Sequence, residues 1–395
     1  MKEILDKKIK IDKSNWQQVK FGDVVFEPKE STKDPIGDKI KHVVGLEHIT
    51  SEDIHLRKSN SIEESTTFTK KFDVDDVLFG RRRAYLKKAA QAQFSGICSG
   101  DITVFRAKEN LLPELLPFIV HNDKFFDYAI KHSAGGLSPR VKFKDLANYE
   151  FLLPSKDQQV QLAKLLWAMD DVIERENEVL GKVSISKKAF KKKWLIKYKN
   201  GIKNKLPKDY KIYRLSEIAD ITGGSTPSRN EPEFWNGSIP WLTPTDVTKH
   251  NKILLDRTRE YITESGLKNI SNRLYPAGSL LYCSRATIGY AIINDVPMAT
   301  NQGFSNFICN EKVNNYFLYF LLEHLTSELT RLAGGSTFLE ISKSSIRRFK
   351  VVIPSKNIMI NITGKLLEYE KTRLELESKI SNSKALQKSL INQVF

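Results

Sequence analysis

Cysteine is scarce in this sequence, and several other features are missing. Its three cysteines, Cys98, Cys283 and Cys309, include no CxxC pair. An odd, widely spaced set argues against a disulfide framework or a zinc site and favours a reducing compartment. No apolar run approaches the roughly 18 residues that span a bilayer, and the first residues, MKEILDKKIKID, have no apolar core. We therefore expect a cytoplasmic protein with no membrane partner.

Motifs that would hold a cofactor or perform catalysis on DNA are also missing. There is no GxGxxG sequence after a strand, no GxxxxGK[ST] loop and no Asn/Asp-Pro-Pro-aromatic tetrapeptide. His42, His48 and His55 recur at spacings of six and seven, which do not suit ligands on one strand or helix. We therefore predict no catalytic residues and no metal site, and a binding protein is favoured over an enzyme.

What the chain does have is positive charge. Its formal net charge is +16 over 395 residues, with 40% hydrophobic and 28% charged residues. This excess favours an anionic partner, with nucleic acid ahead of membrane; a generally lysine-rich proteome is the plainer explanation. Residues 182–205 alone hold ten lysines and no acid. They fit either a solvated helix end or a stripe that meets DNA phosphates or an acidic partner.

The longest regular pattern runs from Ser155 to Asn200. This stretch holds no proline, and Ser155 and Gln158 have the spacing of a capping box. Apolar residues then recur three and four apart, which predicts one helix roughly 65 Å long that acts as a spacer. The predicted apolar seam consists of Leu162, Leu165, Met169, Val172, Val179, Val183 and Phe190.

The same pattern occurs a second time near the end of the chain. LPSK (153–156) returns as IPSK (353–356), an offset of 200, and the following seam contains Ile362, Leu366, Tyr369, Leu376, Ile380, Leu390 and Val394. The tails KAFKKKWL (188–195) and KALQKSLI (384–391) match at an offset of 196, so the second helix is expected to be four residues shorter.

Paired strand and helix patterns precede each long helix, which predicts an internal two-fold repeat. We expect an α/β (α+β) protein in which two long, antiparallel coiled-coil helices separate two similar modules. The predicted organisation is a first recognition module, a central spacer helix, a second recognition module and a C-terminal spacer helix. Their predicted bounds are 1–154, 155–200, 201–354 and 355–395.

Candidate recognition residues gather in loops that follow predicted strands. Arginine can pair bidentately with guanine or grip phosphate, an aromatic among basic residues can stack on a base, and amide side chains suit adenine. A charged hairpin tip is the plainer reading of such a run, and Trp235 is at least as well explained by packing beneath its loop. The predicted DNA-binding residues are Arg81, Arg82, Arg83, Tyr85, Lys87, Ser99, Ser225, Thr226, Arg229, Ser284, Arg285, Thr287, Asn301 and Gln302.

Several of these strings resemble the specificity subunits of type I restriction-modification systems. They are VVGLEHI (43–49), FGRRRAYLKK (79–88), CSGD (98–101), GGSTPSRNEPEFWNGSIPWLTPTDV (223–247), and SRATIGY (284–290) with NQGF (301–304). The resemblance covers nearly the whole chain, and its second-half motifs are the more specific.

The resemblance implies a non-catalytic subunit in which each module reads one half of a split double-stranded DNA site. It also implies that the helices dock two modification subunits and that restriction subunits join the complex. No cofactor would be bound directly, because S-adenosylmethionine, ATP and Mg belong to those partners. The alternatives are a self-contained DNA methyltransferase or nuclease, and a coiled-coil scaffold whose modules bind protein.

Overall fold

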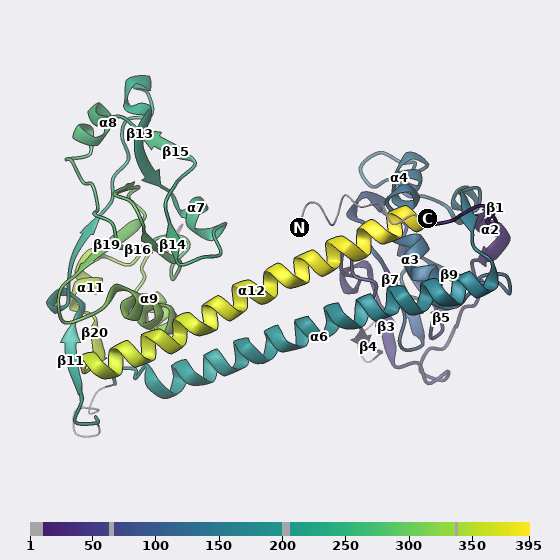
Figure 1. The fold of residues 1–395 in the computed structure, drawn as a ribbon, viewed down its shortest axis with the longest axis horizontal. Coiled ribbons are helices and arrows are strands. Elements are labelled where there is room, and N and C mark those ends of the chain that lie inside the picture. Colours follow the sequence, from purple (N-terminus) through teal and green to yellow (C-terminus); the bar gives the residue numbers. More distant parts are fainter. Residues whose placement is uncertain (1–10, 63–66, 200–205, 336–338) are drawn as a thin grey trace. The chain divides into compact units, whose positions relative to one another are not determined.

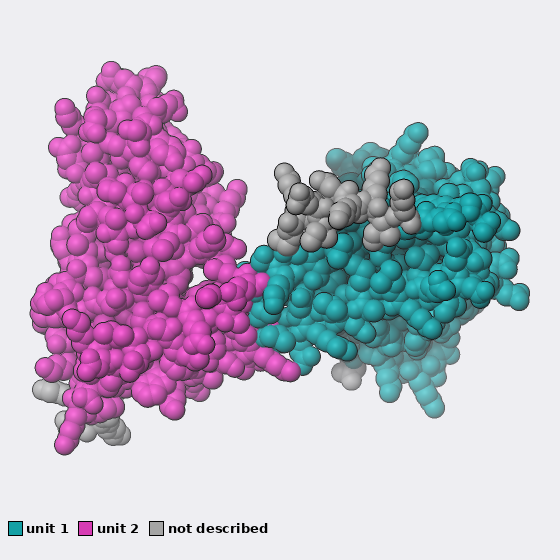
Figure 2. Space-filling view, viewed as in Figure 1, with its two compact units in different colours: residues 1–179, 376–395 teal, residues 180–375 magenta. Residues whose placement is uncertain are grey.

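The computed structural model describes residues 11–62, 67–199, 206–335 and 339–395 of the chain. The chain divides into two compact units, which Figure 2 colours separately: residues 1–179 with 376–395, and residues 180–375. Each unit holds one α/β module together with part of each long helix (Figure 1). We call the module before the first long helix module 1, and the module between the two long helices module 2.

Module 1 is built on two four-stranded sheets. The strand orders are β2-β9-β6-β7 and β4-β3-β8-β5, and within the second sheet β3 and β8 are parallel. Its short helices are α2 (Phe21–Val24), α3 (Leu116–Val120), α4 (Asp123–Lys131) and α5 (Phe143–Leu146). Its strands are β1 (Gln17–Lys20), β2 (Val25–Phe26), β3 (His42–Val44), β4 (Asn60–Ser61), β5 (Lys70–Phe72), β6 (Val77–Gly80), β7 (Ala89–Gln91), β8 (Gly96–Cys98), β9 (Ile102–Ala107) and β10 (Glu150–Leu153).

Module 2 repeats this plan with sheets β12-β19-β16-β17-β14 and β15-β13-β18. Its helices before the second long helix are α7 (Pro244–Thr248), α8 (Glu264–Asn269), α9 (Asn315–His324), α10 (Thr326–Thr330) and α11 (Lys343–Arg348). Its strands are β11 (Tyr210–Arg214), β12 (Ala219–Gly223), β13 (Trp235–Leu242), β14 (Leu254–Leu255), β15 (Glu260–Ile262), β16 (Leu280–Cys283), β17 (Ala291–Asn294), β18 (Ala299–Thr300), β19 (Phe304–Cys309) and β20 (Lys350–Pro354).

The predicted internal repeat is confirmed, although the two sheets hold four and four strands in module 1 and five and three in module 2. The central strands β6 and β16 are both short apolar runs, VLFG and LLYC, that are buried at every residue. Continuous apolar runs of this length suit strands covered on both faces. In each module the first strand pairs antiparallel with the last, β1 with β10 and β11 with β20. The last strand then delivers the chain to a long helix.

The two long helices are α6 (Lys156–Trp194) and α12 (Lys356–Val394), each of 39 residues. The predicted four-residue difference in length is therefore wrong, because the offset of 200 holds at both ends and the tail match at 196 has no structural counterpart. The first helix also ends before the predicted Asn200, which lies outside the described residues. At its start, Gln158 Oε1 accepts from the Ser155 amide at 3.3 Å, which is half of the predicted capping box.

The antiparallel pairing of the helices is seen inside each unit. In the first unit Gln387 donates to the Leu166 carbonyl and Ser383 to the Glu176 carboxylate, at 3.3 and 3.1 Å. In the second unit the Phe190 and Tyr369 rings lie 6.0 Å apart, and Lys187 pairs with Glu370. As the residue number rises along α6, the number of its partner on α12 falls, from Leu166 with Gln387 to Phe190 with Tyr369. The predicted antiparallel arrangement is therefore confirmed.

The buried face of α6 differs from the predicted seam by about one position. The buried residues of this helix in the first unit are Gln159, Ala163, Leu166, Asp170 and Ile173. By contrast, Leu165, Val172 and Val179 are between 44% and 48% exposed. Two of the buried residues, Gln159 and Asp170, are polar, so the spacing of apolar residues could not predict that they are buried.

The polar residues of that face bind module 1. Gln159 Oε1 accepts from the Leu112 amide at 2.8 Å, and Asp170 pairs with His55 at 2.7 Å. Arg57 extends the contact through Glu174 at 2.7 Å. Packing against the module, as well as against α12, therefore decides which side of α6 is covered.

Part of the lysine-rich stretch also has a structural role. Lys191 pairs with Glu323 at 2.9 Å and Lys197 with Glu328 at 2.7 Å. Lys188, Lys192 and Lys193 are exposed, while residues 203 and 205 of the stretch lie outside the described part of the chain. Part of the stretch thus binds acidic residues of module 2, and part keeps its charge at the surface.

Substitution of two adjacent leucines tests the buried face of α6. We expect Leu166→Ala to lower the free energy of unfolding by about 2–5 kcal/mol, because Leu166 is fully buried in the core of the first unit. We expect Leu165→Ala to change it by about 0.5 kcal/mol or less, because Leu165 is half exposed. Urea unfolding of the two variants measures the difference, and equal losses would support the seam predicted from spacing instead.

The contact between His55 and Asp170 predicts a pH dependence of stability. The hydrogen bond that His55 Nε2 donates to the Asp170 carboxylate raises the pKa of His55 above 6.5, although burial opposes the shift. The stabilisation is therefore complete below pH 6.5 and is lost as the pH rises through the raised pKa. We expect the urea midpoint to fall over that window in the wild type and the fall to be absent in His55→Gln.

Another histidine serves as the control for this measurement. Burial lowers the pKa of His121 to about 4, so its contribution has the opposite sign: the stability linked to His121 is present above pH 6.5 and is lost as the pH falls. A His121 variant should therefore keep the fall of the midpoint with rising pH. A His55→Gln variant whose midpoint falls as steeply as that of the wild type would contradict the assignment.

Candidate nucleic-acid interface

The predicted recognition loop of module 1 lies where three segments meet. The Arg81 amide donates to the Asp101 carbonyl at 3.0 Å, and the Arg81 carbonyl accepts from the Val141 amide at 3.1 Å. The Arg83 amide donates to the Pro139 carbonyl at 2.8 Å. Backbone bonds thus tie the arginine run after β6 to the turn before β9 and to the segment before α5.

Arg83 holds an unusual backbone conformation at the tip of this loop. Its φ of 55° and ψ of 57° lie in the left-handed region, which costs a non-glycine residue free energy and persists only where the surroundings enforce it. Ala286, at the same place in module 2, has a φ of 59°. The strained position is therefore built twice, and it turns the side chain of Arg83 to solvent.

Two arginines of this surface share one carboxylate. Arg82 Nη1 lies 3.2 Å from Asp101 and its Nη2 donates to Ser138 Oγ at 3.0 Å. Arg140 Nε donates to the other Asp101 oxygen at 2.7 Å. Burial raises the pKa of Asp101, but the hydrogen bonds from Arg140 and Arg82 outweigh it and hold that pKa below its usual value. Two cations around one anion leave this part of the surface positive.

The remaining predicted residues of module 1 differ in exposure and in their contacts. Tyr85 lies on a 3-10 turn (Ala84–Leu86) and is 53% exposed. Lys87 pairs with Asp123 at 2.9 Å, so its charge is partly satisfied within the module. Ser99 Oγ accepts from the Asp101 amide at 3.2 Å and shapes the turn that carries Asp101.

In module 2 the loop after β16 repeats the same backbone frame. The Ser284 amide donates to the Gly303 carbonyl and the Ile341 amide to the Ser284 carbonyl, both at 2.9 Å. The side chain of Ser284 is buried and lies 3.0 Å from Ser305 Oγ. It therefore supports the loop from inside.

The other two predicted residues of this loop lie nearer the surface. Arg285 is partly exposed and its Nε lies 3.5 Å from Glu340. Thr287 is partly buried, and its hydroxyl has no hydrogen-bond partner among the described residues. Of the three residues predicted here, Arg285 is the one with a charged group at the surface.

Further predicted residues of module 2 form a second cluster beside this loop. The side chains of Thr226 and Gln302 are hydrogen bonded, and the Ser225 amide donates to the Thr300 carbonyl at 2.9 Å. Asn301 Oδ1 accepts from the Gly303 amide at 2.9 Å. Gly224 permits this approach, because a Cβ there would lie 2.0 Å from the Asn301 carbonyl oxygen.

Arg229 is held on an aromatic platform. Its guanidinium carbon lies 3.8 Å from the centre of the Trp235 ring and 5.1 Å from that of Trp241, and it pairs with Glu260. The two indole rings meet edge to face at 5.0 Å. Trp235 is thus packed, which is the plainer of the two readings of its role.

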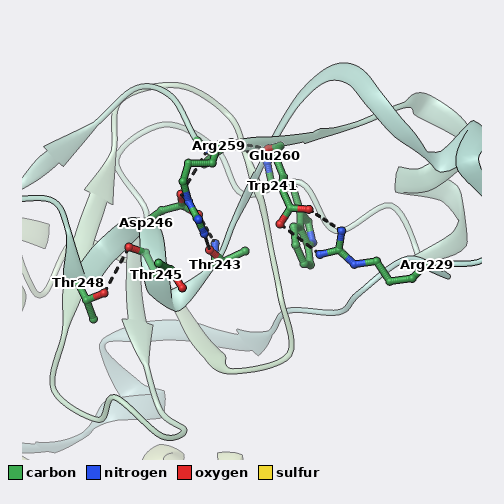
Figure 3. A network of polar contacts seen from close by, with 9 residues as sticks. Arg229, Trp241, Thr243, Thr245, Asp246, Thr248, Arg259 and Glu260 are labelled. Carbon is green, nitrogen blue, oxygen red and sulfur yellow. Dashed lines mark hydrogen bonds and ion pairs between the residues drawn. The ribbon is translucent and has the colours of Figure 1, made fainter. Parts of the chain in front are cut away.

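A second ion pair stiffens the neighbouring turn (Figure 3). Asp246 is buried, accepts from the Thr243 amide at 2.9 Å and pairs with Arg259 at 2.7 Å. Burial raises the pKa of Asp246, and the bonds from Thr243 and Arg259 more than reverse that shift. The platform and this turn therefore form one connected polar network at the β13–β15 end of module 2.

Several residues of this surface were not predicted from the sequence. Asp101, Arg140, Arg259 and Glu340 all take part in its ion pairs. Arg140 and Glu340 lie 200 residues apart, the same offset as LPSK (153–156) and IPSK (353–356), and this repeat was the available signal.

Two further features are absent from the described residues. No cluster of three or more His, Cys, Asp or Glu side chains in the described part of the chain is arranged to bind a metal ion. Among those same residues, no helix combines the length and apolarity needed to cross a membrane.

Comparison with known proteins finds a family whose sequence profile matches this chain twice. The profile described as "Type I restriction modification DNA specificity domain" matches residues 13–184 and again residues 207–383. These two matches fall on the two modules and continue into the long helices.

Individual relatives agree with this match. The MjaIX specificity subunit of Methanocaldococcus jannaschii is 35% identical over 197 residues, which is 48% of this chain and 46% of that protein. The EcoR124I/EcoR124II specificity subunit of Escherichia coli is 28% identical over 213 residues, 52% of this chain and 50% of the relative. The matched region thus spans about half the length of each relative.

A solved structure shares the fold along nearly the whole chain. The S subunit of a type I restriction-modification system from M. genitalium superposes with a TM-score of 0.60 at 13% identity, covering 98% of both chains.

Proposed function

The chain belongs to the family of type I restriction modification DNA specificity domains, and we propose that it is the DNA-recognition subunit of a type I restriction-modification complex. Module 1 reads one half of a bipartite double-stranded site and module 2 reads the other. The subunit itself is not an enzyme; methylation and cleavage belong to modification and restriction subunits, which supply S-adenosylmethionine, ATP and Mg.

One observation supports this reading above the others. The same backbone frame is built in both modules. Arg82 and Arg285 occupy equivalent positions, but Arg140 of module 1 is replaced by Glu340 in module 2, and the exposed Arg83 is replaced by Ala286. A repeated scaffold with varied contact residues suits a protein that reads two different sequences. A protein-binding scaffold would have no need of this basic, paired arrangement.

The alternative of a self-contained methyltransferase or nuclease is less well supported. The sequence has none of the cofactor-loop or catalytic motifs that such an enzyme uses. The net charge of +16 adds a general attraction for DNA. In this proposal Lys and Arg side chains grip phosphates, while the loop residues of each module read base edges.

Replacing each loop tests the proposed division of labour. We expect Arg81→Ala, Arg82→Ala and Arg83→Ala together to impair recognition of one half-site, and Arg285→Ala with Thr287→Ala to impair the other. A lost base contact should cost about 1–3 kcal/mol of discrimination, whereas a lost phosphate contact weakens binding to all sequences alike. Methylome sequencing of cells that carry each variant measures the outcome. Unchanged sites methylated at unchanged rates would show that these loops are not the readers.

The exposed apolar stripe on α6 is the proposed docking surface for a modification subunit. Leu165, Val172 and Val179 are seven residues apart, so they lie along one side of the helix, and each is about half exposed. A spacing of seven is that of a helix which packs against another helix. No part of the described chain covers these three side chains fully, so we infer that a helix of the modification subunit packs there.

Two matched valine substitutions test this docking surface. We expect Val172→Glu to abolish co-purification of the modification subunit, because it places a charge within the apolar contact. Val160→Glu is the control: Val160 is 40% exposed on the same helix but points about 120° away from Val172. If the Val172→Glu and Val160→Glu variants co-purify equal amounts of the modification subunit, the stripe is not its docking surface.

A further inference from the structure

A second segment of each module runs alongside the recognition loop. In module 1, Ala134 and Arg140 exchange backbone hydrogen bonds, both at 2.9 Å, and Arg140 also forms a bridge with Arg82. In module 2, Gly334 and Glu340 exchange bonds at 3.0 Å, and Glu340 forms a bridge with Arg285. The position of Arg140 is therefore as firmly fixed as that of the loop itself.

The two arginines of module 1 differ in which nitrogens are already engaged. Arg82 uses both of its Nη atoms, one on Asp101 and one on Ser138. Its Nε is buried and has no partner among the described residues. Arg82 is therefore committed to the protein, although its sequence context marked it as a reader.

Arg140 is engaged in the opposite way. Its inner nitrogen, Nε, holds Asp101 at 2.7 Å. Its outer Nη1 reaches only the Ser138 carbonyl, at 3.5 Å, and Nη2 makes no bond within the described part of the chain. The side chain is 44% exposed. A fixed guanidinium thus presents its two outer nitrogens to solvent.

The equivalent positions of module 2 carry different charges. The residue that matches Asp101 in the backbone frame is Gly303, and the one that matches Arg140 is Glu340. Module 2 therefore pairs one arginine, Arg285, with one carboxylate, whereas module 1 sets two arginines around Asp101. Module 1 therefore has one more arginine than carboxylate at this place, and the nitrogens that stay available are the Nη atoms of Arg140.

We propose that Arg140 contacts DNA in the first half-site through its two outer nitrogens, and that Asp101 is the positioning residue that aims it. The inference rests on the proposed function as a DNA-recognition subunit. Two parallel N–H donors suit two acceptors side by side, which DNA offers at the N7 and O6 atoms of guanine and at the oxygens of a phosphate. Arg82 anchors the other side of Asp101.

Three variants test the contact in the subunit assembled with its modification subunits. Binding is measured for Arg140→Ala, Arg140→Lys and the control Lys144→Ala, on duplexes in which each base of the first half-site is changed in turn. Lys144 is exposed, carries the same charge and lies four residues along the chain. We expect Lys144→Ala to match the wild type.

The pattern of losses identifies the group that is bound. For guanine, Arg140→Ala and Arg140→Lys should both lose roughly 5- to 150-fold of discrimination at one base pair of the first half-site only. For phosphate, Arg140→Ala should weaken all sequences alike and reduce the salt slope by about 0.9, and lysine should largely restore both. Arg140→Ala binding like Lys144→Ala on every duplex would overturn the proposal.

Asp101→Asn tests the positioning role separately. If Asp101 acts by aiming Arg140, the change should weaken binding when Arg140 is present and add little when Arg140 is already alanine. Independent losses in the double variant, together with a lower thermal midpoint in each variant, would assign Asp101 a merely structural role. If the proposed function itself is wrong, the wild-type complex will bind all duplexes equally. That result is distinct from a failure of the Arg140 proposal, in which the wild type prefers one sequence and the variant keeps that preference.

Discussion

The pairing of the first and last strands of each module is the interaction on which the rest of the architecture depends. β1 lies antiparallel to β10 from Gln17–Leu153 to Lys20–Glu150, and β11 lies antiparallel to β20 in the same way. The chain therefore enters and leaves each module on two neighbouring strands. Because the exit strand runs directly into Lys156 or Lys356, this pairing also fixes where each long helix begins.

The recognition surface shows how one backbone frame serves two chemistries. Hydrogen bonds between main-chain atoms hold the three segments of each frame, so the side chains are free to differ. Module 1 places Asp101 between two arginines, and module 2 places Glu340 beside a single one. The fold thus supplies position, and in the proposed function the residues at a few solvent-facing points supply selectivity.

Much of this organisation was predictable from the sequence, because it rests on repetition and periodicity. The modules, the long helices, their antiparallel pairing and the two recognition loops all follow from patterns that are local or repeated. The face of α6 was harder, because Gln159 and Asp170 are buried by partners in module 1 that no helical pattern reveals. Arg140 was missed for a related reason: the contact that singles it out is with Asp101, which lies 39 residues away in the chain.

The division of the chain into units has a consequence for the order of folding. The second unit is continuous from residue 180 to residue 375, whereas the first needs residues 376–395 as well. Leu390, Ile391, Val394 and Phe395 belong to the core of the first unit, so that core stays incomplete until these residues have left the ribosome. Contacts so distant in sequence form slowly. The first unit is therefore begun before the second and completes its core after it, with apolar core surface exposed while residues 180–375 are made.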